Sequence, residues 1–145
     1  MQKIELKNDL GKVFFTLEFK QQEDLIYANW IGFVNVDNVI EGATKVLDAI
    51  ESTHCSNFIN DNRELNGPWK NANDWIENIW TPKAVGAGLR NFAFIVSPNI
   101  FAELSAKDLS VRLDNVGFEM RTFKDYESAL SWIKKNNLAG HIMSE

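Results

Sequence analysis

The chain has 145 residues, 45% of them hydrophobic, and this size suits one domain with one buried core. A formal net charge of −5 and the lack of a lysine and arginine cluster argue against a nucleic-acid partner, whose phosphates require concentrated positive charge. One cysteine excludes an internal disulfide, and because no apolar run suits a signal peptide or a bilayer, we expect a cytoplasmic protein without a membrane span.

The first third of the chain changes from the period of a strand to that of a helix. Apolar side chains alternate over residues 13–19, and an apolar segment over residues 25–34 follows a polar turn, which predicts a β-hairpin. After Asn35, a good N-cap residue, apolar residues recur at the i, i+3, i+4 spacing. This pattern predicts a helix over residues 36–50 that packs on a sheet.

The middle of the chain combines a short strand, a polar loop and an interrupted helix. Residues 57–60 suit a buried strand, and residues 61–73 contain a Gly-Pro turn and many polar side chains. Asp74 is a candidate N-cap, while Thr81, followed by a proline, suits the start of a fresh helical piece. We therefore predict a broken helix over residues 75–87, ended by glycines.

The last third alternates again between strands and helices. The continuously apolar residues 92–96 suit a central strand that is covered on both faces. A short helical turn at 100–104 and a separate helix starting from a capping box at 105–108 follow, and then a strand at 118–123 and a helix at 126–135. We assign residues 1–138 to a single domain and expect residues 139–145 to form a loose C-terminal tail.

This order of elements predicts an α/β fold, in which a mixed, mostly parallel sheet begins with a β-hairpin and carries about four or five helices. The segments "NFIND", "GLRNFAFIVSPN" and "FEMRTFKDYESALSWIKK" resemble the STAS domain family, in particular proteins similar to the sporulation anti-sigma-factor antagonist. The resemblance covers roughly residues 12–136. It implies a small, non-enzymatic regulatory module that docks a partner protein and is often switched by phosphorylation of a serine just after the third strand.

That serine is missing from this chain. Asp61 matches the aspartate that precedes the serine in the family, but the chain has no serine, threonine or tyrosine from there to Trp80. A phosphoryl group, with its charge of about −2, therefore has no attachment point in this segment. We expect a STAS-like binding module without the phosphorylation switch.

Candidate binding residues lie where strands are expected to end, because open α/β sheets bind ligands and partners at the carboxyl ends of their strands. They are Asn35, Asp37, Asp61, Asn62, Arg63, Trp69, Ser97 and Lys124. Purely structural roles remain open for most of them, such as capping for Asn35 and Ser97. Trp69 stands in a polar loop without a local apolar period, so either packing or contact with a partner is open.

Two classes of binding remain open. In the first, the rim around residues 61–73 docks a protein partner or a second copy of the chain. In the second, a small apolar or lipid-like ligand occupies a pocket under the broken helix 75–87. The expected lining of that pocket is Trp75, Ile79, Trp80 and Phe101.

Residues for catalysis or for cofactor binding are scarce. The two histidines, His54 and His141, form neither a metal-ligand pattern nor a triad. The glycines at 86 and 88 follow a helix instead of a strand, which is the wrong order for a dinucleotide-binding loop. Cys55 suits a small buried apolar position. We predict no enzymatic activity, no cofactor and no metal site.

Overall fold

A mixed sheet of six strands organises the computed structural model, which describes residues 3–144 and the side chains of residues 3–138. The strands are β1 (Ile4–Lys7), β2 (Val13–Lys20), β3 (Leu25–Gly32), β4 (Asn57–Leu65), β5 (Asn91–Ile95) and β6 (Glu119–Phe123), side by side in this order. The pairs β1–β2 and β2–β3 are antiparallel, and the remaining pairs are parallel. The predicted α/β class and mixed sheet are confirmed.

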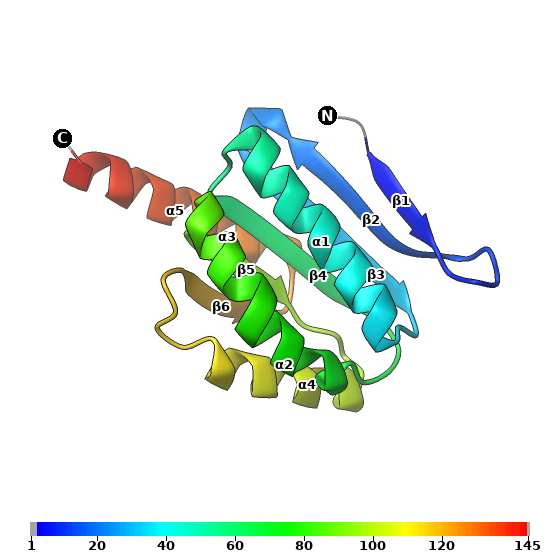
Figure 1. Ribbon diagram of the computed structural model, residues 1–145. Helices are drawn as coiled ribbons and strands as arrows, with labels where there is room; N and C mark the ends of the chain where they lie inside the picture. The colour runs from blue at the N-terminus through cyan, green and yellow to red at the C-terminus, as the bar shows by residue number, and fades with distance from the viewer. Residues whose placement is uncertain (1–2, 145) are drawn as a thin grey trace.

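Helical segments cover both faces of the sheet (Figure 1). They are α1 (Val36–Thr53), α2 (Asn73–Trp75), the π-helical turn η3 (Ile76–Trp80), α3 (Thr81–Ala87), α4 (Ile100–Arg112) and α5 (Tyr126–Ser144), with short 3-10 turns η1 (Gln21–Glu23) and η2 (Lys70–Ala72). Consecutive parallel strands are neighbours, so crossovers of one hand place α1, α3 and α4 on the same face. α5 follows the last strand and packs on the opposite face.

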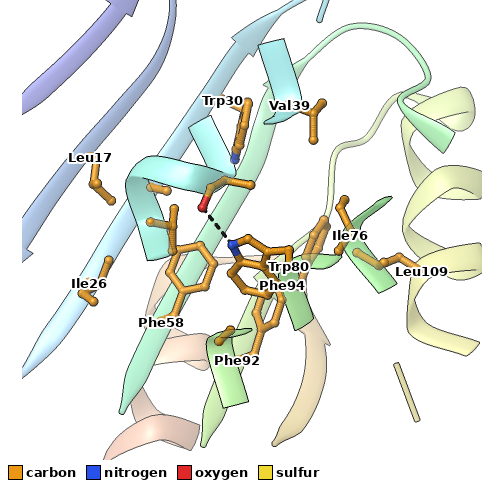
Figure 2. Close-up of a cluster of buried hydrophobic side chains, with 14 of the residues drawn as sticks. Leu17, Ile26, Trp30, Val39, Phe58, Ile76, Trp80, Phe92, Phe94 and Leu109 are labelled. Atoms are coloured by element: carbon orange, nitrogen blue, oxygen red, sulfur yellow. Dashed lines mark hydrogen bonds between the residues drawn. The ribbon is translucent and has the colours of Figure 1, made fainter. Parts of the chain in front are cut away.

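The two faces of the sheet carry separate cores. The larger core lies under α1, α3 and α4, where aromatic side chains from the strands meet apolar side chains from the helices; it includes Trp30, Val39, Phe58, Ile76, Trp80, Phe92, Phe94 and Leu109 (Figure 2). The smaller core lies under α5 and includes Leu25, Ile59, Ala93, Ile95, Ala129, Trp132 and Ile133. β4 and β5 are therefore buried on both faces, which explains the continuous apolar run in β5.

Several predicted helix ends are confirmed. Asn35 caps α1, because its Oδ1 accepts from the backbone N–H of Asn38 at 2.8 Å. In return, Oδ1 of Asn38 accepts from the backbone N–H of Asn35. Gly88 ends α3 with a left-handed φ of 116°, which favours glycine, whereas Gly86, which was also predicted to end the helix, lies inside it. Asp125 accepts from the backbone N–H of Ser128 at 2.8 Å at the start of α5.

Other predictions about the strands are incomplete or wrong. The predicted hairpin is confirmed as β2 and β3, but β1, which was not predicted, pairs with β2 ahead of it. β4 extends to Leu65 instead of ending at residue 60, since residues 64 and 65 pair with Ile31 and Gly32 of β3. Residues 61–65 consequently belong to a strand and not to the predicted loop.

The predictions about helix breaks are also wrong. The helical path from α2 through η3 into α3 is continuous, because Trp80 and Thr81 both have right-handed helical dihedrals. A π-helical turn therefore replaces the expected break at Thr81. In the same way, α4 is one helix capped by Asn99, and Ser105 lies inside it with its hydroxyl donating to the carbonyl of Phe101 at 3.1 Å.

α5 is longer than predicted. The helix was expected to end at residue 135, with a loose tail from residue 139, but its backbone is helical as far as Ser144. Residue 145 of that predicted tail lies outside the described residues. Within residues 3–144, none of the helices combines the length and the apolar character that crossing a bilayer requires.

Candidate functional site

The loops at the carboxyl edge of the sheet are joined by hydrogen bonds. After β4, the backbone N–H of Asn66 donates to the carbonyl of Gly32 at 2.9 Å, and the carbonyl of Asn66 accepts from Nδ2 of Asn99 at 2.9 Å. The hydroxyl of Ser97 donates to the carbonyl of Leu65 at 2.8 Å. The segments that follow β3, β4 and β5 therefore hold one another in place.

Exposed apolar side chains gather on these joined segments. We call the following residues the edge patch: Phe33, Val36, Ile100, Phe101 and Leu104. Phe33 is 73% exposed and lies against Gly67, where an added Cβ would come 2.9 Å from its ring. Phe101 is 59% exposed and follows Asn99, whose side chain bonds to the same loop. Large exposed apolar side chains on neighbouring segments are typical of interaction surfaces.

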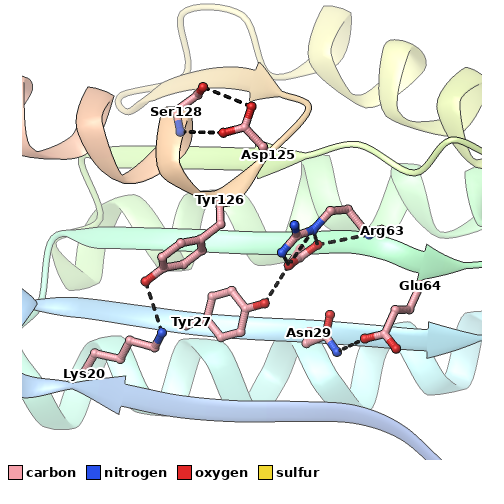
Figure 3. Close-up of polar contacts among 9 residues, drawn as sticks. Lys20, Tyr27, Asn29, Arg63, Glu64, Asp125, Tyr126 and Ser128 are labelled. Atoms are coloured by element: carbon pink, nitrogen blue, oxygen red, sulfur yellow. Dashed lines mark hydrogen bonds and ion pairs between the residues drawn. The ribbon is translucent and has the colours of Figure 1, made fainter.

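Arg63 pairs with Asp61 and lies near Tyr126 at the start of α5, on the face of β4 that is opposite the larger core (Figure 3). The carboxylate of Asp61 accepts from the hydroxyl of Tyr27 at 2.6 Å and from Nη2 of Arg63 at 2.7 Å. Burial alone would raise the pKa of Asp61, but these hydrogen bonds outweigh burial and hold that pKa below its ordinary value. The same pairing raises the pKa of Arg63. Asp61 is thus ionised and saturated with donors, so it is a poor acid or base.

Lys20 extends this polar group along the same face. Its ammonium lies 4.7 Å from the ring centroids of both Tyr27 and Tyr126 and donates to the hydroxyl of Tyr126 at 3.1 Å (Figure 3). Burial and the hydrogen bond to Asp61 raise the pKa of Tyr27. These contacts join β2, β3, β4 and α5, and they indicate a structural role.

Asn62 lies on the other face of β4, because successive side chains of a strand point to opposite faces. It is buried and accepts from Nδ2 of Asn60 at 3.0 Å, while Oδ1 of Asn60 accepts from the indole of Trp30 at 2.7 Å. Both asparagines line a cavity of about 50 Å³ inside the larger core. The predicted group at residues 61–63 is therefore divided between two faces of the sheet.

Trp69 is buried, so of the two alternatives that the sequence left open, packing is the one that the structure shows. Its side chain is only 7% exposed and stacks on Phe94 with ring centroids 5.7 Å apart. Its backbone N–H donates to the hydroxyl of Ser105 at 3.1 Å. The loop after β4 thus folds under α4, and Trp69 lines the cavity instead of the surface.

The pocket expected under the helix 75–87 has a different lining from the predicted one. Trp80 lines the cavity, whereas Ile79 and Phe101 are exposed and Trp75 is half-buried. The continuous helical path turns Ile76, not Ile79, toward the core. The predicted lining is therefore wrong for every member except Trp80.

The remaining candidates have varied positions. Asn35 is an exposed helix cap and Asp37 is exposed in the first turn of α1, beside Val36 of the edge patch. Ser97 is buried and braces the loop after β4. Lys124 is exposed after β6, which lies at the far side of the sheet from β3.

The sequence reasoning missed most of the edge patch. The sequence predicts Phe33 as part of the apolar strand over residues 25–34, and Ile100 and Leu104 as apolar positions of a helical turn. The sequence contains a usable signal, because apolar residues lie on both sides of the helix from Ile100 to Arg112. A single buried face cannot cover all of them, so some must be exposed.

The chemistry available at these sites is limited. Among residues 3–144, no cluster of three or more histidine, cysteine, aspartate or glutamate side chains could hold a metal ion. Cys55 is buried, and its Sγ donates to the carbonyl of Asp24 at 3.3 Å. Burial raises the pKa of Cys55 to about 11, so the thiolate is scarce at neutral pH.

Comparison with known proteins leaves the family open. No family model and no curated protein matches the chain. The resemblance to STAS domains is therefore a hypothesis from the sequence, and functional inference rests on the geometry of the edge patch and the cavity.

Proposed function

We propose that the chain is a non-enzymatic regulatory or binding module that docks a protein partner on the edge patch. The observation that carries this proposal is the exposure of the five apolar side chains on segments that hydrogen bonds hold together. Apolar surface left in water is unfavourable by about 25 cal/mol per Å², so covering the patch would supply binding free energy.

The character of the patch favours a protein as occupant. It contains the aromatic rings of Phe33 and Phe101, which stand out from the surface. Large aromatic side chains are typical anchors of protein interfaces, whereas small ligands bind in concave pockets. Because the supporting loops are already braced, docking would cost little loss of backbone freedom.

Charge favours a different protein over a second copy of this chain. The chain has a net charge of −5, and Asp37 and Glu41 are exposed in the first turns of α1, the helix that begins at Val36. A second copy would bring like charge to the interface, which opposes association. A partner with an apolar centre and a basic rim would complement this surface.

The proposed docking surface lies at the edge of the sheet that the sequence indicated, but it consists of the edge-patch residues instead of the predicted ones. The carbonyl of Leu65 at the end of β4 and that of Asn66 in the following loop accept the bracing hydrogen bonds, while Trp69 stays buried beneath that loop. Docking at this edge is consistent with what the STAS resemblance implies, apart from the missing serine after Asp61.

The test places a photo-crosslinking phenylalanine analogue at position 101 in the cells that make the protein. The control carries it at Val111, which is 79% exposed on the same helix but outside the patch. We expect one defined protein to crosslink from position 101 and not from position 111. With that partner purified, Phe33→Ser combined with Phe101→Ser should weaken binding by about tenfold or more, and Val111→Ser should not.

Two results would overturn the proposal. One is equal affinity of the purified partner for the wild type and the double variant. The other is a crosslink between two copies of the chain, together with a dimer in light scattering that disperses on Phe101→Ser. That second result would assign the patch to self-association.

A further inference from the structure

The cavity in the larger core has walls from every layer on that face of the sheet. β3, β4 and β5 form its floor, α1 covers one side, and the π-helical turn contributes Ile76 and Trp80. Its volume is about 50 Å³, which suits roughly two to four non-hydrogen atoms. π-helical turns are rare in proteins, but those that occur are often found at functional sites.

The buried polar atom of the cavity lining that lacks a partner is a hydrogen-bond donor. Trp69 lines the cavity, and its indole Nε1 is buried without a partner among the described residues. The side-chain oxygens of Asn60 and Asn62 already accept from Trp30 and Asn60, respectively. The indole of Trp69, the amide nitrogen of Asn62 and the second N–H of the Asn60 amide are the N–H groups left for an acceptor.

The rest of the lining decides the kind of acceptor. No lysine, arginine, aspartate, glutamate or histidine is part of this lining, and most of its members are aliphatic or aromatic. An ionised group would lose its hydration there without a counter-charge, which is strongly unfavourable. A neutral oxygen would satisfy the N–H groups, because a buried unpaired donor costs about 1–3 kcal/mol.

We propose that this cavity is a binding site for a small neutral molecule with an apolar body and one carbonyl-type oxygen that accepts from the indole N–H of Trp69. The amide of Asn62 is the second donor. Val34, which is only partly buried, lines the cavity just after β3, so the cavity approaches the carboxyl edge of the sheet. This site is separate from the edge patch and does not depend on protein docking.

The test compares three probes of equal size: acetone, isobutene and acetate. Each is titrated into protein that carries ¹⁵N-labelled tryptophan, and the five indole N–H resonances are followed by NMR. Acetone should move the Trp69 resonance downfield because a carbonyl accepts its proton. Isobutene should bind without that downfield shift, and acetate should not bind.

Variants identify the donor. Trp69→Phe should lower the ratio of acetone affinity to isobutene affinity by about fivefold, since only the acetone complex loses a hydrogen bond. Ala43→Val, which adds two carbon atoms to the lining, should weaken the binding of both acetone and isobutene. Trp132→Phe is the control, because Trp132 packs in the smaller core under α5.

The proposal is overturned if the wild-type Trp69 resonance does not respond to acetone, or if acetone and acetate shift it equally. It is also overturned if a long-lived water at the Trp69 indole persists at saturating acetone, which would make the cavity a buried water site. These measurements on the wild type hold even where a variant fails to fold, and they are independent of the crosslinking result.

Discussion

The indole N–H of Trp80 donates a 2.8 Å hydrogen bond to the backbone carbonyl of Ala43, and this bond joins the π-helical turn to α1 (Figure 2). The ring of Trp80 also meets Phe92 and Phe118 edge-on, with centroids 5.9 and 6.4 Å away. One side chain therefore connects two helical segments to the sheet across the larger core.

Trp80→Phe should lower the free energy of unfolding by about 2–3 kcal/mol, because the variant loses the bond to Ala43 and part of the buried ring. Urea denaturation measures this change. Trp75→Phe is the matched control: Trp75 is half-buried beside the same turn, and its variant should lose less than about 1 kcal/mol. Equal losses in both variants would contradict the role assigned to Trp80.

Glycine-to-alanine changes should have opposite effects in two helices. A Cβ at Gly42 of α1 would clash with the ring of Trp30 and lie 3.0 Å from Phe15, so Gly42→Ala should destabilise by about 1–3 kcal/mol. A Cβ at Gly86 of α3 meets nothing within 4 Å, so Gly86→Ala should stabilise by about 0.5–1 kcal/mol. Thermal and urea unfolding of the two variants test the signs, and a stabilising Gly42→Ala would show that the ring can move away.

Asp61 should make stability depend on acid pH. Its folded pKa lies below the unfolded value of about 3.9, so its contribution is fully present above that pH and is lost as the pH falls through the folded pKa. Asp61→Asn should cost about 1–3 kcal/mol at neutral pH, and the gap to the wild type should shrink below about pH 4. Urea denaturation over a pH series gives the gap at each pH. The control is Asp9→Asn in an exposed turn, which should be as stable as the wild type across the pH series. If the difference in stability between Asp61→Asn and the wild type stayed constant with pH, the assigned ion pair would be excluded.

Cys55 should be protected from thiol reagents in the folded protein. Burial raises the pKa of its thiol to about 11, compared with about 8.5 for a free cysteine, so both access and thiolate content are reduced. The reaction with a disulfide reagent at neutral pH should be slower than in denaturant by about a hundredfold or more. A native rate close to the denatured rate would mean that the thiol is exposed.

Local patterns predicted much of the fold. The helix over residues 36–50 followed from its apolar spacing, and Asn35 followed from its capping side chain, because both signals lie within a few residues of the feature that they predict. The continuous apolar run of β5 indicated a strand covered on both faces, as the two cores confirm. The order of strands and helices came from the same local periods.

The errors concern features that depend on distant partners. β4 extends through residues 61–65 because β3 offers pairing groups there, and sequence periodicity does not record that pairing. Asp61 and Asn62 consequently face different layers, and the predicted single cluster does not exist. The π-helical turn at Ile76–Trp80 likewise placed Ile76 in the core and left Ile79 exposed.

By itself, the sequence determined the α/β class, the order of the elements and several helix ends, since hydrophobic periods and caps act over a few residues. Only the tertiary structure decided that Trp69 is buried, because the groups that cover it, such as Ser105, lie far away in the chain. It also decided that Phe33 and Phe101 stay exposed at one edge, since burial depends on which elements meet and not on how apolar a side chain is.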